Sequence, residues 1–213
     1  MSKKITKINS LKKTEGFLQV NYDKGFKYLD SAGEFMNSLY ETGNKTPGHF
    51  ITPEGMRVIF SEKKEIKLSP YSLWLHFVEP ISFDEQKKEL LHKIDLVNSI
   101  IQPQKYTRIG WRCYLAYPCG ENYPKILPDD ILAGGAFAEV VFTKKINEFD
   151  SKISVSTAVN LDKNEKVILF DIDIYKIINI KRENFDEIKI LIEKIEAAFN
   201  SDDLLDSVNF MLK

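Results

Sequence analysis

Residues 107–117 read TRIGWRCYLAY, and this stretch decides the fold class. Successive side chains of an extended strand point to opposite faces of a sheet, so a period of two separates the two faces. One set is apolar and would face a core: Ile109, Trp111, Cys113 and Leu115. The other set is Arg108, Gly110, Arg112 and Tyr114. The sequence therefore predicts a long mid-chain strand with one buried face.

Shorter stretches with strand character lie on both sides of this one. They cover residues 17–22, 26–29, 56–61, 65–68, 72–78, 137–143, 153–159 and 167–174. Asp23-Lys24-Gly25 separates the first two and predicts a hairpin, because Asp and Gly favour tight turns. The polar residues 162–165 separate the last two, which predicts an antiparallel pair.

Four positions carry the chemistry of a helix start, and they are Ser31, Ser82, Asn184 and Ser201. Ser31 with Glu34 and Ser82 with Glu85 fit capping boxes, in which a hydroxyl and a carboxylate bond free backbone N–H groups. An apolar stripe spaced three or four residues apart follows Ser82: Leu90, Ile94, Val97 and Ile101. The sequence predicts long helices after Ser82 and Asn184, and shorter ones elsewhere.

The order of these elements predicts the α+β class. Runs of adjacent strands with few helices between them favour a mostly antiparallel sheet, with two long helices and shorter helices packed on it. A parallel sheet would need a helix between nearly every pair of strands. We expect one domain over residues 1–213, with possible related halves 1–117 and 136–213. Residues 118–135 contain three prolines and a Gly-Gly pair and would form a loop between the halves.

The charge of the chain is almost balanced, with 30 basic and 31 acidic residues and a net charge of -1. Such a chain has no global attraction to a nucleic acid or an anionic membrane, which argues against both as partners. The basic N-terminus has no apolar run behind it, and Cys113 and Cys119 form no disulfide framework. The sequence thus predicts a cytoplasmic protein, and its many Lys, Ile and Asn residues suggest a bacterial one.

A candidate metal site lies in the stretch 170–174, which reads FDIDI. The period of two places Asp171 and Asp173 on one strand face, where, with Glu139 from another strand, they have the chemistry to hold a divalent metal. The alternative interpretations are that both aspartates belong to a solvated polar face, or that they pair with Arg108 and Arg112 across the sheet.

A candidate anion site lies on the predicted strand 107–117. Arg108 and Arg112 stand four residues apart on one face, with Tyr114 beyond them. Two guanidinium groups on one face can hold a phosphate or a carboxylate. The sequence contains neither a G-x-G-x-x-G nor a P-loop motif, and no G-x-S-x-G elbow. It therefore names no catalytic residue and no cofactor.

Two segments of the chain resemble a known group of proteins. One is Tyr106-Thr107-Arg108-Ile109-Gly110-Trp111-Arg112, and the other is Leu169-Phe170-Asp171-Ile172-Asp173 followed by the helix after Asn184. Together they resemble an uncharacterised, sporadically distributed bacterial domain family with a T-R-I-G-x-R strand and an L/F-D-I-D strand before a C-terminal helix. The resemblance covers roughly residues 50–213. It implies the same fold and a partner-binding role of the kind found near phage-defence genes.

Three functional hypotheses follow. The leading one is a non-enzymatic interaction or accessory subunit, of a bacterial defence or toxin–antitoxin-like system, whose partner is another protein or a second copy. The second is a metal-dependent phosphodiesterase or nuclease, with Asp171, Asp173 and Glu139 on the metal and Arg108 and Arg112 on the phosphate. The third is a sensor that binds a small anion at the two arginines.

Overall fold

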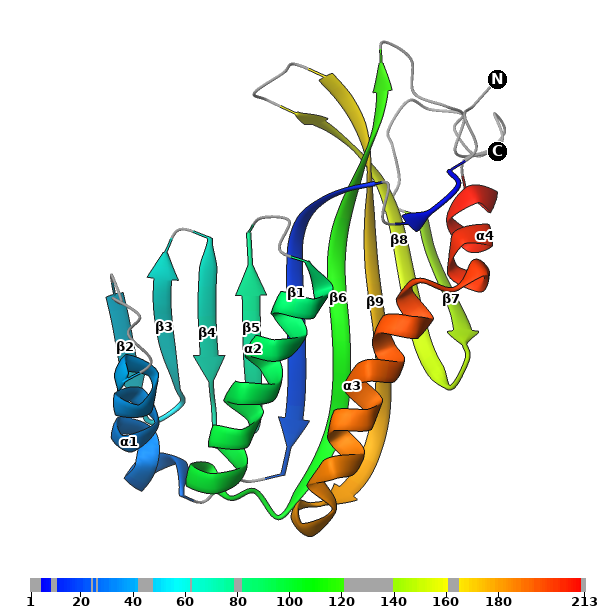
Figure 1. Cartoon of the computed structure of the whole chain (residues 1–213). Helices are drawn as coiled ribbons and strands as arrows, with labels where there is room; N and C mark the ends of the chain where they lie inside the picture. Colours follow the sequence, from blue (N-terminus) through cyan, green and yellow to red (C-terminus); the bar gives the residue numbers. More distant parts are fainter. Residues whose placement is uncertain are drawn as a thin grey trace.

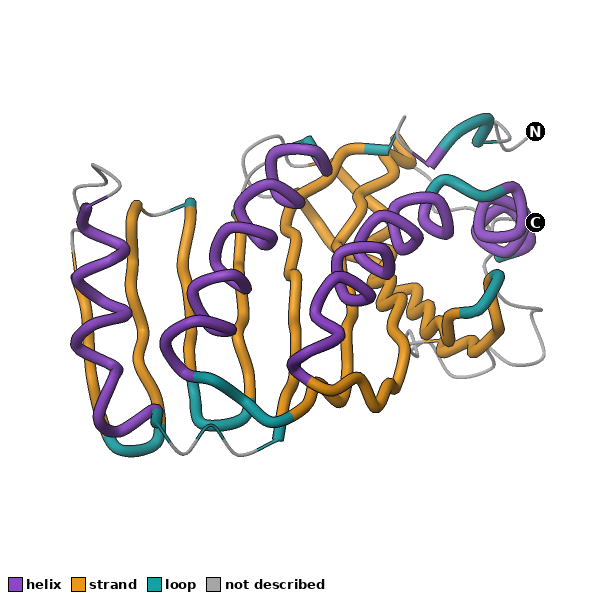
Figure 2. Tube along the Cα trace, turned by 60° about the horizontal axis from the view of Figure 1, so that its bottom comes forward, coloured by secondary structure: helices purple, strands orange, loops and turns teal. Residues whose placement is uncertain are grey.

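The computed structural model describes residues 5–8, 11–23, 25, 27–41, 48–61, 63–78, 82–120, 140–160 and 165–211. Its nine strands form one antiparallel sheet in the order β2-β3-β4-β5-β1-β6-β9-β8-β7. The helices α1, α2 and α3 lie side by side on one face of this sheet (Figures 1 and 2). This arrangement confirms the α+β class and the antiparallel sheet. None of the described helices has the length and apolar character needed to cross a membrane.

The strands are β1 (Lys12–Tyr22), β2 (Gly48–Thr52), β3 (Gly55–Ser61), β4 (Lys64–Leu68), β5 (Ser72–Phe77), β6 (Lys105–Gly120), β7 (Val140–Ile146), β8 (Phe149–Asn160) and β9 (Glu165–Lys181). The helices are α1 (Tyr28–Glu41), α2 (Phe83–Leu96), α3 (Phe185–Phe199) and α4 (Asp202–Phe210). A π-helical turn, Val97–Ile101, extends α2, and a 3-10 turn, Arg182–Asn184, precedes α3.

The strand order repeats one pattern of connections. The chain places β1 at the centre, crosses to the outer strand β2, and returns by hairpins through β3 and β4 to β5, which pairs with β1. It then repeats this path with β6, β7, β8 and β9, and a long helix follows each set. Because β1 pairs with β6, the two sets share one continuous sheet.

The core lies between the sheet and the three helices, as the alternation in residues 107–117 predicts. Ile109, Trp111, Cys113 and Leu115 of β6 are all buried. The ring of Trp111 lies 4.2 Å from that of Phe83 in α2 and 4.1 Å from that of Phe199 in α3. Trp111 therefore joins β6 to both long helices.

The predicted helix starts at Ser82 and Ser201 are confirmed. The Ser82 hydroxyl accepts the backbone N–H of Glu85, and the Glu85 carboxylate accepts the backbone N–H of Ser82. The Ser201 hydroxyl accepts the backbone N–H of Leu204. At Asn184 a helix also begins, but the side chain makes no capping bond and a 3-10 turn comes first.

The predictions of a hairpin at residues 23–25, of a strand over 26–29 and of a helix start at Ser31 are wrong, because β1 pairs with β5 and β6 and is followed by a helix. Residues 28–41 form α1, so the predicted strand 26–29 does not exist and Ser31 lies inside a helix. The reason is a buried stripe with helical spacing, which begins at Tyr28 and continues through Ala32, Phe35 and Leu39. The Tyr28 hydroxyl also donates to the Thr52 carbonyl of β2 at 3.1 Å. This contact anchors the first turn to the sheet.

The two ends of the described chain meet. The backbone N–H of Ile5 donates to Oδ1 of Asn209 at 2.9 Å, and Nδ2 of Asn209 donates to the Ile5 carbonyl at 2.8 Å. Both groups are buried, so this pair satisfies backbone groups that water cannot reach. It attaches the N-terminal segment to α4.

Candidate functional site: the open face of the sheet

None of the described helices packs on the second face of the sheet, which we call the open face (Figures 1 and 2). The strand registers place its side chains in rows that run across the strands. One row is Phe50, Arg57, Lys67, Trp74, Gln19, Gly110 and Tyr175. The next row is Glu65, His76, Phe17, Arg112, Asp173 and Lys152. Arg108, Tyr114 and Asp171 lie in the rows that flank these two. All four aspartate and arginine side chains singled out in the sequence therefore lie on this face.

The two arginines and the two aspartates bind each other. Nε of Arg112 donates to Oδ1 of Asp171 at 2.7 Å, and its Nη2 donates to the other carboxylate oxygen. Nη2 of Arg108 donates to Oδ2 of Asp173 at 3.1 Å, and its Nη1 donates to Gln19 at 2.9 Å. The structure thus shows the cross-strand pairing that was the alternative to a metal site. An anion at these arginines would have to compete with an aspartate.

Each guanidinium also lies over an aromatic ring. The guanidinium carbon of Arg108 is 4.8 Å from the centre of the Tyr175 ring, and that of Arg112 is 5.2 Å from the centre of the Tyr114 ring. Such cation–π contacts hold the planar group against the ring. Tyr114, predicted as part of an anion site, therefore positions Arg112.

Burial and hydrogen bonding act on these groups in different ways. Burial raises the pKa of Asp173, and the positive charge of Arg108 opposes that rise. The hydrogen bond to Asp171 raises the pKa of Arg112 above its already high value. Arg112 is therefore protonated at neutral pH. The ion pairs are the resting state of this surface.

The predicted metal site is only partly placed by the structure. Asp171 and Asp173 lie on one face, as predicted, but both bind arginines. Glu139, the third predicted ligand, lies outside the described residues. Within the described ranges, no three His, Cys, Asp or Glu side chains come close enough to hold a metal ion. A metal that involves Glu139 stays a prediction.

Beside the ion pairs lies an aromatic cluster, made of Phe17, Trp74, His76 and Tyr114 from β1, β5 and β6. The rings of Phe17 and His76 stack with their centres 4.2 Å apart and their planes within 7°. Trp74 and Tyr114 each meet Phe17 edge to face, at 6.4 and 6.0 Å. The four rings are half-buried, so part of each remains accessible on the open face.

A glycine makes room for this arrangement. An added Cβ on Gly110 would lie 3.0 Å from Cβ of Tyr175 and 3.1 Å from Nη1 of Arg108. The absence of a side chain lets Arg108 cross the sheet toward Gln19 and Asp173. A small cavity of about 80 Å³ remains at this point, and its lining includes Gly110 and Trp74.

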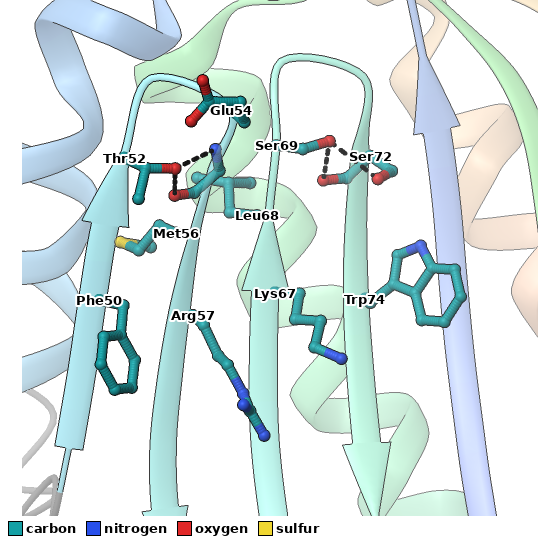
Figure 3. A pocket seen from close by; sticks show the side chains of 11 residues that line it. Phe50, Thr52, Glu54, Met56, Arg57, Lys67, Leu68, Ser69, Ser72 and Trp74 are labelled. Atoms are coloured by element: carbon teal, nitrogen blue, oxygen red, sulfur yellow. Dashed lines mark hydrogen bonds between the residues drawn. The ribbon is translucent and has the colours of Figure 1, made fainter.

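A larger cavity of about 550 Å³ lies on the other side of Trp74, over β2 to β5. Figure 3 shows Phe50, Arg57, Lys67 and Trp74 on neighbouring strands, with the helices behind the sheet. Arg57 donates two hydrogen bonds of 2.8 Å to Glu65, and Lys67 lies 3.1 Å from the same carboxylate. Arg57 and Lys67 thus share the carboxylate of Glu65 beside the rings of Phe50 and Trp74, and the carboxylate of Glu54 also lines the cavity. The cavity has the size of a small-ligand site.

The sequence matches no known protein-family model and no curated protein. Functional arguments therefore rest on the open face itself.

Sequence reasoning found the charged half of this face and missed the aromatic half. The period-two pattern of Ser72, Trp74 and His76 was a readable sign that these side chains share a face. Phe50 had no such sign, because nearly all of β2 is exposed.

Proposed function

We propose that the open face binds another protein, and that the chain acts as a non-enzymatic interaction or accessory subunit. The observation that carries this proposal is the group of half-buried aromatic rings and arginines on a sheet face that no described helix covers. Trp, Tyr and Arg are the residues most enriched at the energetic centres of protein interfaces. The role in a bacterial defence or toxin–antitoxin-like system belongs to the same proposal and rests on the sequence resemblance.

The charge pattern of this face supports a protein partner over a nucleic acid. Arg108 and Arg112 each bind an aspartate, and Arg57 binds Glu65. Binding to a phosphate backbone gains free energy when lysine or arginine side chains replace the counterions of the nucleic acid. Arginines that are already paired with carboxylates contribute little to this gain. A surface of alternating charges and aromatic rings instead resembles a protein interface.

The side chains of this face are held in place before a partner arrives. Arg112 is held by two hydrogen bonds and an aromatic ring, and Phe17 is held between His76 and Tyr114. Ordering a long side chain on binding costs about 0.5–1.5 kcal/mol. Side chains that are already ordered avoid most of that cost, which favours tight association.

Native mass spectrometry of the protein purified from its host tests this proposal. We expect the wild-type protein to carry a second protein in a fixed molar ratio. The control variant Leu29→Ala, which changes an exposed side chain of α1, should carry the same protein in the same ratio. Trp74→Ala and Phe17→Ala should lose that protein while melting at nearly the same temperature as the wild type. A bare chain, a bound nucleic acid, or a protein that both variants retain would overturn the proposal.

A second candidate, a sensor for a small anion, is favoured by the cavity beside Trp74. The cationic groups of Arg57 and Lys67 line the cavity beside the rings of Phe50 and Trp74, so an aromatic carboxylate could bind there by ion pairing and ring contact, in competition with Glu65. Calorimetric titration with benzoate and with inorganic phosphate tests it. We expect benzoate to bind the wild type and to bind Lys67→Gln at least several-fold more weakly, and the absence of heat with both probes would exclude these ligands.

A further inference from the structure

A second surface lies where β9 continues past its neighbour β8. The pairing of β8 with β9 stops at Asp150 and Tyr175, whereas β9 continues to Lys181. Residues 176–181 pair with β6 on one side, and no described strand pairs with them on the other (Figure 1). The outward-pointing backbone N–H and C=O groups of such an edge can hydrogen-bond to an added strand.

An apolar groove lies between this edge and α3. Its volume is about 420 Å³, and its apolar lining comes from Ile177, Ile178 and Ile180 of β9 and from Ile190 and Leu191 of α3. Ile177 is 64% exposed and Ile190 is 53% exposed. Ile190 faces water on the α3 side of the groove, whereas Ile177, which pairs with Arg108, faces water on the opposite side of the β9 edge.

One end of the groove carries a surplus positive charge. Lys176 of β9 and Lys194 of α3 both bind the carboxylate of Glu148, and the Lys194 contact is 2.7 Å. The two ammonium groups lower the pKa of Glu148, which is therefore ionised at neutral pH. Two cations against one anion leave one positive charge unbalanced. Glu187, near the start of α3, lines the other end.

We propose that this groove binds an extended peptide segment of a partner protein, which adds to β9 as an antiparallel strand and places an acidic residue at Lys176 and Lys194. An antiparallel strand beside residues 176–181 runs from Lys181 toward Lys176. Its C-terminal end therefore arrives at the positively charged end of the groove. Main-chain hydrogen bonds would provide affinity, and the aliphatic groove would select alternate side chains.

Charge argues against a second copy of this chain as the occupant. Antiparallel pairing of two such edges would bring Lys176 of one copy beside Lys181 of the other, and like charges placed opposite each other destabilise a pair. The edge also contains a bulge. Tyr106 pairs with Ile180 and Arg108 pairs with Ile177, so a step of two residues on β6 matches a step of three on β9. The bulge interrupts regular pairing and restricts an added strand to a short segment.

This inference concerns a different surface from the open-face proposal and does not depend on it. Selection of a displayed library of random ten-residue peptides on the full-length protein tests it. We expect enriched peptides with alternating apolar residues and an acidic residue near the C-terminal end. Ile190→Asp and Lys194→Glu should each weaken binding of a selected synthetic peptide at least about tenfold. The first places a charge in the apolar groove, and the second reverses the charge that the acidic residue of the peptide would meet.

Leu29→Asp and Lys88→Glu are matched controls, since they make the same changes at exposed positions of α1 and α2. Methylating the backbone amides of the peptide one at a time separates strand addition from other modes. Strand addition predicts that only alternate methyl groups abolish binding. A library without enrichment, binding that Ile190→Asp leaves intact, or uniform tolerance of methylation would overturn the inference.

Discussion

Arg112 lies directly opposite Asp173 in the register of β6 and β9, yet its guanidinium binds Asp171, which lies opposite Tyr114. The diagonal contact leaves Asp173 to Arg108. Two ion pairs therefore run obliquely across the same two strands. Both pairs join β6 to β9, next to the β1–β6 pairing at which the two sets of strands meet.

We expect the Arg112–Asp171 pair to contribute modestly to stability. The Arg112 side chain is 45% exposed, so water screens the interaction. A double-mutant cycle with Arg112→Gln and Asp171→Asn, measured by urea unfolding, should give a coupling free energy of about 0.5–1 kcal/mol. The same cycle on the exposed Lys181–Glu183 contact should give nearly zero. Equal coupling at both pairs would contradict this expectation.

Glu65 should make the stability of the protein depend on pH. Burial opposes ionisation of Glu65, but hydrogen bonds from Arg57 and Lys67 prevail and lower its pKa below the ordinary 4.5. A lowered pKa means that its stabilising contribution is present above the unfolded-state pKa and is lost as the pH falls through the folded-state pKa. Urea unfolding should therefore find Glu65→Gln less stable than the wild type at pH 7. A difference of equal size at pH 3 would show that the charge is not the cause.

Replacing Trp111 should be among the most damaging changes in the core. Trp111→Ala removes contacts with Phe83 and Phe199 and should lower the free energy of unfolding by about 3–5 kcal/mol. Trp111→Phe should cost much less, since Nε1 of Trp111 is buried without a hydrogen-bond partner in the described part of the chain. Trp74→Ala on the open face is the matched control. Chemical denaturation of all three variants would measure their free energies of unfolding. A larger loss of stability for Trp74→Ala than for Trp111→Ala would contradict this prediction.

Two glycines should respond to alanine with opposite signs. At Gly110 the added methyl group would press on Tyr175 and Arg108, so we expect a loss of about 1–3 kcal/mol. At Gly33, on α1, nothing lies within 4 Å of the added methyl group, and alanine favours the helix by about 0.5–1 kcal/mol. Thermal unfolding should show a lower Tm for Gly110→Ala and a higher one for Gly33→Ala. A higher Tm for Gly110→Ala would show that the Arg108 side chain can adopt another conformation that avoids the added methyl group.

The elements that sequence reasoning misassigned are those whose stability depends on distant partners. The start of α1 depends on the contact between Tyr28 and Thr52 and on burial against the sheet, neither of which is visible in residues 26–34. The strand β2 was missed because four of its five residues are exposed. A strand without a buried face has no alternation of apolar and polar residues to detect.

The aromatic half of the open face illustrates the same difficulty. Phe17 and Trp74 belong to strands that are separated in sequence by α1 and three other strands. They meet only because β5 returns to pair with β1. Nothing in either strand alone specifies that pairing. The charged half was predicted because each of its pairs of like side chains lies within one strand.

The sequence by itself determined which side chains of β6 and β9 face the core and which face outward, together with the antiparallel α+β class. These features follow from the period of two along a strand and from the order of elements, which are local properties of the chain. Only the tertiary structure decided that Asp171 binds Arg112, 59 positions away, and that Phe17 stacks on His76. Those contacts depend on strand order and register, which packing of the whole sheet against α1, α2 and α3 sets.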